Sequence, residues 1–163
     1  MALRQVRVDD DPILRKTSKV VNEVTEKEIE LLDDMYDTMM ASDGVGIAAV
    51  QVGVLKRMVL VSIPDPEAAE EDWVTIEMIN PEILERSNDT QICMEGCLSV
   101  PGKQGEVTRP KKVKVKYYDR EMNEHIEEFD SFGAVVCSHE IDHLDGVLYT
   151  DKAMNLEDIP VQE

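Results

Sequence analysis

The sequence predicts an α+β fold in which short antiparallel strands pack around a late helix, with an amphipathic helix near the N-terminus. Three observations lead to this class. Residues 26–41 carry apolar side chains at helical spacing, residues 131–145 do so around the pattern HEIDH, and several segments between them have the apolar and β-branched composition of strands. With 163 residues the chain is long enough for one core and short for two. We therefore expect residues 1–163 to form a single domain.

The first predicted helix begins behind a capping-box signature. Thr25 is followed three residues later by Glu28, so each side chain can accept a hydrogen bond from a backbone N–H near the other. Behind this pair, apolar residues recur every three or four positions, as one buried helix face requires: Ile29, Leu32, Met35, Tyr36, Met39 and Met40. An amphipathic helix is predicted over 26–41.

The middle of the chain predicts a loop followed by strands. Gly44 and Gly46 indicate a loop after the first helix. The segments 54–63 (VLKRMVLVSI) and 72–80 (DWVTIEMIN) are rich in residues that favour strands, and the polar stretch PDPEAAEED between them predicts a loop. A further strand is predicted over 107–119, and the turn-like DREMNE joins it to EHIEEF as a hairpin. The acidic tail after Tyr149 predicts no element.

The late helix is predicted over 131–145. Asp130 or Ser131 can serve as its N-cap, and Gly146 is the residue type that commonly follows a helix end. The apolar run that favours the helix comprises Phe132, Ala134, Val135 and Val136.

This helix carries a metal-binding pattern. His139 and His143 lie four residues apart, hence on one helix face, where two imidazoles can hold one ion, and Glu140 flanks them. The longer pattern HExxHxxGxxH would need a histidine where Tyr149 stands. Few residues follow His143, so a third ligand is expected upstream.

Two upstream residues are candidates for that ligand. His125 lies in the charged segment NEHIEE, where an exposed histidine is the simpler interpretation. Cys97 lies in EGCLSVPG, where Gly96 permits close approach of backbone and a thiolate can complete a Cys-His-His set. A small buried thiol is the alternative interpretation of Cys97.

Charge and composition limit the class of protein. Lys and Arg total 17 against 35 Asp and Glu, giving a net charge of −18 that disfavours direct binding to nucleic acid or to anionic membranes. No stretch approaches the ~18 apolar residues of a membrane span, and MALRQVRVDDDP lacks the apolar core of a signal peptide. The odd cysteine count suits a reducing compartment, so we expect a cytoplasmic protein with free thiols or metal ligands.

Three motifs together resemble a known family. GVGIAAVQ at 44–51, EGCLS at 95–99 and HEIDH at 139–143 are similar, in this order, to the motifs of the peptide deformylases, and the resemblance extends to about Asp151. It implies a single catalytic domain over 1–163 that removes the formyl group from the N-terminal methionine of newly made polypeptides and releases formate. It also implies one divalent metal ion per chain, bound by Cys97, His139 and His143. Fe²⁺ is expected in the cell, and Zn²⁺ or Ni²⁺ in purified protein, since this ligand set suits all three.

The same resemblance implies roles for further residues. Glu140 would transfer a proton from water to the departing amine, and the Gln51 side-chain amide and the Leu98 backbone N–H would stabilise charge on the formyl oxygen. Backbone groups would bind the extended substrate peptide, and a pocket would take the methionine side chain. Val45 and Gly96 would bind the peptide backbone, with Gly46 as a further substrate-binding residue. The pocket residues would be Val45, Cys93, Phe132 and Val136, for which ordinary core packing is the alternative interpretation.

Two nearby residues complete this picture. The chain departs from the family at Ser138, where the residue before HExxH is usually Gln, which affects any bond that Gln supplies to the metal ligands. Arg109 falls where it can pair with Glu95 and steady the segment that carries Cys97, and a solvated arginine is the alternative interpretation.

The expected partners are N-formylmethionyl nascent peptides, and an encounter with the ribosome is compatible with this role. We expect neither membrane association nor direct binding of nucleic acid.

Two other functions remain open from the sequence. A closed zinc site of Cys93, Cys97, His139 and His143 would make the protein a metal-stapled binding module. An HExxH endopeptidase is the third interpretation.

Overall fold

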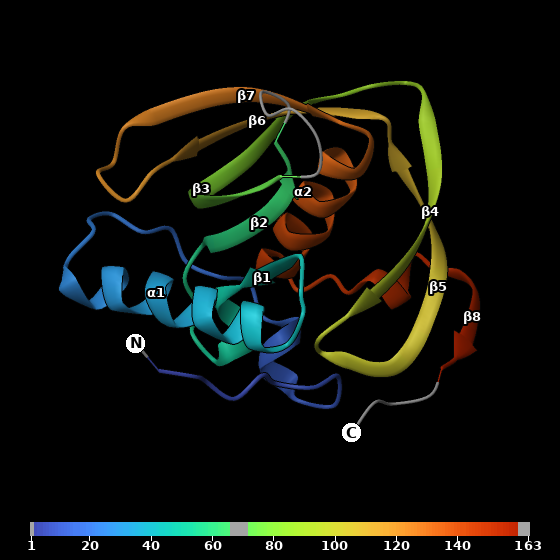
Figure 1. Cartoon of the computed structure of the whole chain (residues 1–163), viewed down its shortest axis with the longest axis horizontal. Coiled ribbons are helices and arrows are strands. Elements are labelled where there is room, and N and C mark those ends of the chain that lie inside the picture. The colour runs from blue at the N-terminus through green and yellow to red at the C-terminus, as the bar shows by residue number, and fades with distance from the viewer. Residues whose placement is uncertain (1, 66–71, 160–163) are drawn as a thin grey trace.

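The predicted α+β class is confirmed by the computed structural model, which describes residues 2–65 and 72–159. Two sheets flank the late helix (Figure 1). The five-stranded sheet has the order β1-β2-β3-β6-β7, and the three-stranded sheet has the order β4-β5-β8. The strands are β1 (Gly46–Ala48), β2 (Met58–Pro64), β3 (Trp73–Arg86), β4 (Thr90–Cys97), β5 (Val100–Pro110), β6 (Lys112–Tyr118), β7 (Glu124–Asp130) and β8 (Met154–Asp158).

The first helix forms where the capping box predicts it. Helix α1 spans Glu26–Ala41, the Thr25 backbone N–H donates to Glu28 Oε1 at 2.9 Å, and the Thr25 hydroxyl oxygen accepts from the Lys27 N–H at 3.3 Å. Leu32, Met35 and Met39 are fully buried against the sheet. Tyr36 and Met40, which the spacing assigned to the same face, are instead largely exposed.

The second helix, α2, spans Ser131–Leu144, one residue shorter than predicted, and confirms the late helix. Asp130 occupies the N-cap, and Gly146 follows the helix end with a φ of 75°. A side chain at Gly146 would place its Cβ 2.5 Å from the Arg15 carbonyl oxygen. Glycine is therefore required at this turn for both its conformation and its size.

Strand β2 lies at the centre of the core because helices cover both of its faces. Val59, Val61 and Ile63 pack against α2, whereas Met58 and Leu60 pack against α1. This double burial explains why the strand is continuously apolar from Met58 to Val61 rather than alternating. Helix α2 is thereby fixed between the two sheets.

Several predicted boundaries were wrong. The predicted strand over 107–119 is two strands, because β5 ends at Pro110 and β6 begins at Lys112 in the other sheet. Gly46 begins β1 instead of lying in a loop, and β3 continues past residue 80 through a register shift to Arg86. The hairpin of β6 and β7 is confirmed, with Lys112 opposite Asp130 and Tyr118 opposite Glu124.

Strands β4 and β8 carried no pattern that predicted them. β4 contains Gly96 and exposes every second residue, and every residue of β8 is exposed. Part of the predicted polar loop at 64–72 lies outside the described residues, as do the last four residues of the acidic tail. None of the helices in the described ranges is long and apolar enough to cross a membrane.

The capping box of α1 gives a stability prediction. Thr25→Ala removes the hydroxyl oxygen that accepts the Lys27 N–H, so the free energy of unfolding should fall by about 1 kcal/mol. Thr25→Ser keeps that oxygen and should lose much less. Urea denaturation of the three proteins measures the difference. An equal loss in both variants would show that the hydroxyl does not stabilise α1.

Candidate active site

Helix α2 and the end of β4 bring three metal-ligating atoms together. The ligand atoms of Cys97, His139 and His143 all lie within 4.8 Å of one another. Cys97 Sγ is 3.4 Å from His143 Nε2, and the two Nε2 atoms are 3.3 Å apart. Tetrahedral metal sites with ordinary bond lengths have ligand separations of roughly 3.3–3.6 Å. The two distances from His143 Nε2 are therefore those expected around a single metal ion.

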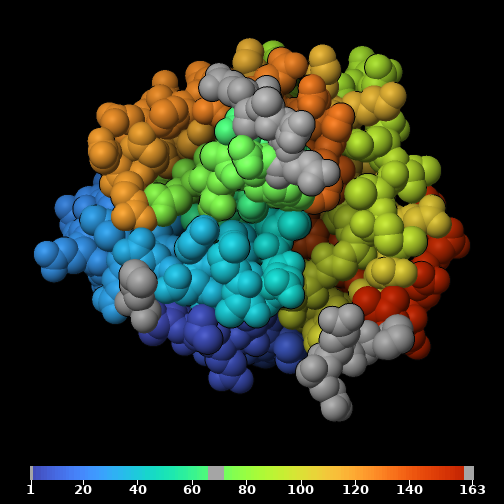
Figure 2. Space-filling view, viewed as in Figure 1, coloured from blue at the N-terminus to red at the C-terminus, as the bar shows by residue number. Residues whose placement is uncertain are grey.

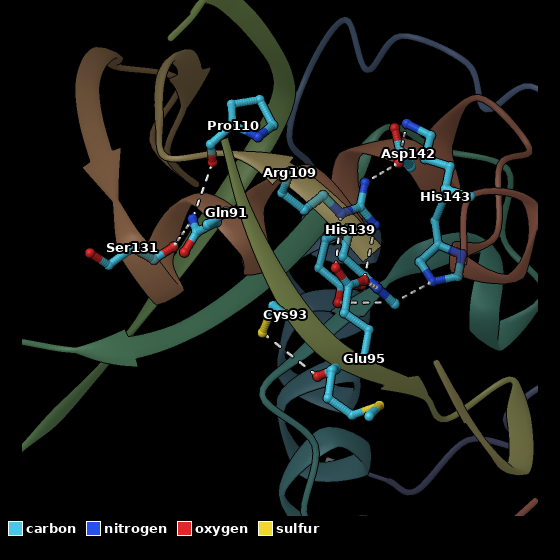
Figure 3. Close-up of polar contacts among 12 residues, drawn as sticks. Gln91, Cys93, Glu95, Arg109, Pro110, Ser131, His139, Asp142 and His143 are labelled. Carbon is cyan, nitrogen blue, oxygen red and sulfur yellow. Dashed lines mark hydrogen bonds and ion pairs between the residues drawn. The ribbon is translucent and has the colours of Figure 1, made fainter. Parts of the chain in front are cut away.

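The orientation of His139 is fixed by a buried ion pair. Its Nδ1 is 2.9 Å from Glu95 Oε1, which leaves Nε2 facing His143 (Figure 3). Arg109 donates to both carboxylate oxygens of Glu95, at 2.9 and 3.0 Å, and to Asp142 at 2.7 Å. The predicted pairing of Arg109 with Glu95 is confirmed. A carboxylate behind a ligating imidazole selects its tautomer and holds the ring in place.

The ionisation of these groups follows from burial and their neighbours. Burial opposes the charged form of Glu95, but hydrogen bonds from His139 and Arg109 prevail and lower its pKa. Burial, together with the positive charges of His139 and Arg109, holds the pKa of His143 well below its usual value, so this imidazole is neutral and keeps a lone pair. Burial would also lower the pKa of His139, but the negative charge of Glu140 and the hydrogen bonds that His139 itself makes with Cys97 and Glu95 raise it. A metal ion bound at His139 would therefore displace a proton.

Glu140 is a buried carboxyl beside the proposed ligands. Burial raises the pKa of Glu140 to about 7, and the charge of His139 opposes that rise. Its Oε2 is 3.9 Å from His139 Nε2, and its Oε1 is buried with no hydrogen-bond partner among the described residues. A buried oxygen without a partner is costly, so this atom is positioned to bind a group that enters the site.

Gly46 creates the space in which Glu140 lies. A Cβ at this position would overlap Glu140 Oε2 and lie under 3 Å from two carbons of the same side chain. Strand β1 therefore needs a residue without a side chain here. The sequence suggested that Gly46 binds substrate, but gave no sign of this packing role.

Gln51 is held so that its amide NH₂ faces Cys97. The residue is buried in a 3₁₀ turn after β1, and its Oε1 accepts from the Ala48 backbone N–H at 2.9 Å. Its Nε2 then donates to Ser99 Oγ at 3.1 Å and lies 3.6 Å from Cys97 Sγ. The side-chain amide is thus an oriented donor next to the ligand group.

These groups face one pocket of about 340 Å³. Figure 2 shows the surface hollowed between the cyan residues that follow α1 and the olive residues of the β4–β5 hairpin. Eleven of the residues singled out from the sequence line this pocket, and His143 lies behind it in the ligand group. They are Val45, Gly46, Gln51, Cys93, Gly96, Cys97, Leu98, Phe132, Val136, His139 and Glu140.

Some lining residues were missed by the sequence analysis. Val135 lies beside Val136 on α2 and lines the pocket, although its neighbour alone was assigned there. Lys103 on β5 and Ile159 after β8 also line it. No sequence pattern could have indicated Ile159, because its position depends on the pairing of β8 with β5.

Three other side chains lie apart from the ligand group. Cys93 is not one of the clustered ligand atoms, and its thiol is 3.7 Å from the Met94 carbonyl oxygen, so the four-ligand zinc site does not form among the described residues. His125 pairs with Asp119 at 2.7 Å and stacks on Tyr117. The Ser138 hydroxyl is buried and finds no partner in the described ranges, so it does not replace a glutamine side chain as a donor to the ligands.

Comparisons with known proteins agree with this geometry. The family model described as polypeptide deformylase matches residues 3–158. A peptide deformylase of Finegoldia magna is 46% identical over 99% of this chain and 96% of its own, and one of Lachnoclostridium phytofermentans is 51% identical over 93% and 90%.

Solved structures show the same similarity. The class I type b peptide deformylase of Acinetobacter baumannii, in a crystal structure with Met-Ala-Ser bound, superposes with a TM-score of 0.85 at 36% identity, covering 92% of this chain and 98% of that one. The peptide deformylase of Thermotoga maritima gives a TM-score of 0.84 at 38% identity, covering 93% and 98%. The chain therefore belongs to the peptide deformylase family, metal-dependent hydrolases that remove the formyl group from an N-terminal methionine.

Proposed function

We propose that Cys97, His139 and His143 hold the single metal ion with which this chain hydrolyses N-formylmethionyl peptides. The observation that carries the proposal is the clustering of the three ligand atoms within 4.8 Å, with His143 Nε2 at tetrahedral-edge distances from both Cys97 Sγ and His139 Nε2. Three protein ligands leave a position open, as catalytic sites require, whereas a structural site would be closed by a fourth. A divalent ion held there supplies Lewis acidity, which makes hydroxide available near neutral pH and polarises a carbonyl oxygen.

Glu140 is proposed to move the proton in this hydrolysis. Its carboxylate takes a proton from the attacking water and delivers it to the amine nitrogen as the bond between formyl carbon and nitrogen breaks. Formate and a free N-terminal methionine result. The unpartnered Oε1 and the pKa of about 7 support this role, because both indicate a carboxyl that can accept and release a proton near neutrality.

Gln51 and Leu98 are proposed to stabilise the negative charge that develops on the formyl oxygen. The Gln51 NH₂ is oriented by the bond from Ala48 to its carbonyl oxygen, so the donor needs no rearrangement when charge develops. Leu98 lies in the two-residue turn between β4 and β5, directly after the ligand Cys97. Its backbone N–H is therefore next to the ligand group.

The substrate peptide is proposed to bind as an extended strand between the two sheets. β1 and β4 are edge strands of their sheets in the described part of the chain, and Val45, Gly46 and Gly96 line the pocket beside them. Backbone bonding of this kind tolerates different peptide sequences. The methionine side chain would enter among Cys93, Phe132, Val135 and Val136.

The cellular setting is inferred from the same chemistry. We propose Fe²⁺ as the ion in the cell and Zn²⁺ or Ni²⁺ as its replacement in purified protein, because a thiolate with two imidazoles accepts all three. Residues 1–163 are proposed to act as one catalytic domain in the cytoplasm, on nascent chains at or near the ribosome. The net charge of −18 supports recognition of the peptide rather than of RNA.

The ligand assignment predicts different outcomes for two cysteines. Cys97→Ser should lose most bound metal and activity, because a neutral hydroxyl replaces a thiolate ligand. Cys93→Ser is the matched control and should keep its metal, since Cys93 lies outside the ligand group. Metal analysis and formate release from a formyl-Met peptide measure both. Loss of metal from Cys93→Ser would instead support the alternative interpretation, a structural site with four ligands.

The role of Glu140 predicts a loss of turnover without a loss of metal. Glu140→Gln keeps the size of the side chain but cannot accept the proton, so kcat should fall by at least about 10²-fold. Metal content and the thermal midpoint should match the parent protein. A kcat within tenfold of the parent would exclude Glu140 as the group that transfers the proton.

Gly46 should also affect turnover through Glu140. Gly46→Ala places a methyl group against the carboxylate, and a displacement of about 1 Å is expected to lower kcat by on the order of 10²-fold with metal retained. Gly133→Ala on α2 is the control, because its Cβ would make only ordinary contacts at 3.6 Å or more. Steady-state kinetics on both variants, with metal content measured, test the packing argument. Parent-like kcat in Gly46→Ala would contradict it.

A further inference from the structure

The last described strand of the chain reaches the catalytic pocket. Strand β8 runs antiparallel to β5, with Met154 opposite Glu106 and Asp158 opposite Lys103. Figure 1 shows β8 on the outer side of β5, away from β4. Beyond β8, the Ile159 backbone N–H donates to the Gly102 carbonyl oxygen at 2.9 Å. This bond carries the chain from the edge of the small sheet toward the β4–β5 turn.

The attachment of β8 depends on backbone and on a glycine in β5. A Cβ at Gly105 would lie 2.9 Å from Ala153 Cβ and 3.2 Å from Leu156 Cδ1, so β5 must lack a side chain where this segment crosses it. Lys103 Nζ pairs with Asp158 Oδ1 at 2.9 Å, and Gln104 donates to Glu157. All five residues of β8 are exposed, so the strand buries little apolar surface of its own.

Ile159 is the point at which this segment contributes to the active site. It lines the same pocket as Glu140 and His139, together with Lys103. Lys103 in turn lies beside Gly96, since a Cβ on Gly96 would be 3.6 Å from the Lys103 carbonyl oxygen. Gly96 is where the substrate backbone is proposed to bind. An apolar side chain with 36% of its surface exposed thus lies at the pocket wall next to the proposed path of the substrate.

We infer that the segment formed by β8 and Ile159 is a wall of the substrate cleft, and that Ile159 contacts the side chains of the first residues after formylmethionine. This inference rests on the proposed binding of the peptide along Gly96. The proposed methionine pocket lies among residues of α2 and β4, away from Ile159. Ile159 is therefore placed to contact the substrate residues that follow the methionine. The C-terminal segment then makes the enzyme favour peptides with apolar residues at those positions.

The size of the effect follows from partial burial of one aliphatic contact. A methylene group in a hydrophobic pocket changes discrimination by at least about tenfold. A half-open wall should contribute less, so we expect about a fivefold preference from Ile159. The preference should appear in binding and KM, because Ile159 is not one of the groups placed at the reacting atoms.

The test compares Ile159→Ser with Met154→Ser, which changes an exposed residue of the same strand outside the pocket. Calorimetry measures the affinity of each protein for the product peptides Met-Leu-Leu and Met-Ser-Ser. Formate release from formyl-Met-Leu-Leu and from formyl-Met-amide gives KM and kcat. Ile159→Ser should weaken the binding of Met-Leu-Leu and raise the KM for formyl-Met-Leu-Leu, each about fivefold. The affinity for Met-Ser-Ser, the KM for formyl-Met-amide and kcat should not change. Met154→Ser and Ile159→Leu should behave like the parent protein.

Two results would overturn the inference. Unchanged affinity of Ile159→Ser for Met-Leu-Leu would show that Ile159 does not touch the peptide. An equal loss on all ligands, including formyl-Met-amide, would show that the substitution acts through the fold. Product peptides bind without being hydrolysed, so the binding result stands separately from the catalytic roles assigned to Glu140 and Gln51.

Discussion

The buried ion pair of Glu95 and Arg109 is the interaction on which the site depends. It joins the β4–β5 hairpin, which carries Cys97, to helix α2, which carries both histidines, because Glu95 also contacts His139 and Arg109 also contacts Asp142. Both side chains of the pair are at most 4% exposed. Loss of one partner would leave an uncompensated buried charge, which costs far more than loss of a surface ion pair. One interaction therefore sets both the relative position of the ligands and the orientation of an imidazole.

Helix α2 supports this arrangement because its two faces have different partners. Ala134, Cys137 and Leu144 pack into the core against the large sheet. His139 and Glu140 face the pocket, and His143 completes the ligand group behind it. Ligands that come from a buried, packed helix and from a strand end have little freedom to move, which is the condition for a preorganised site. The apolar face of the helix thus fixes the position of the proposed ligands on the polar one.

The cleft uses features that are usually hazards in a sheet protein. Free strand edges invite pairing with other chains, and β1 and β4 both present such edges within the described residues. Here they flank the pocket and can bind an extended peptide through its backbone. The glycines on these two strands differ in their surroundings. Gly46 makes room for Glu140, whereas a Cβ at Gly96 would meet only the Lys103 carbonyl oxygen at an ordinary distance of 3.6 Å.

The sequence by itself determined the features that depend on neighbouring residues. The capping box and helical spacing located α1, the HEIDH pattern located α2 and two proposed ligands, and the pairing of Arg109 with Glu95 was predicted. Tertiary structure decided what depends on contacts between distant segments. It excluded Cys93 from the ligand group, divided residues 107–119 between two sheets, showed that Gly46 accommodates Glu140, and brought Ile159 to the pocket. Periodicity reports which face of an element is buried, but strand partners and the space beside a glycine are set by residues far away in the chain.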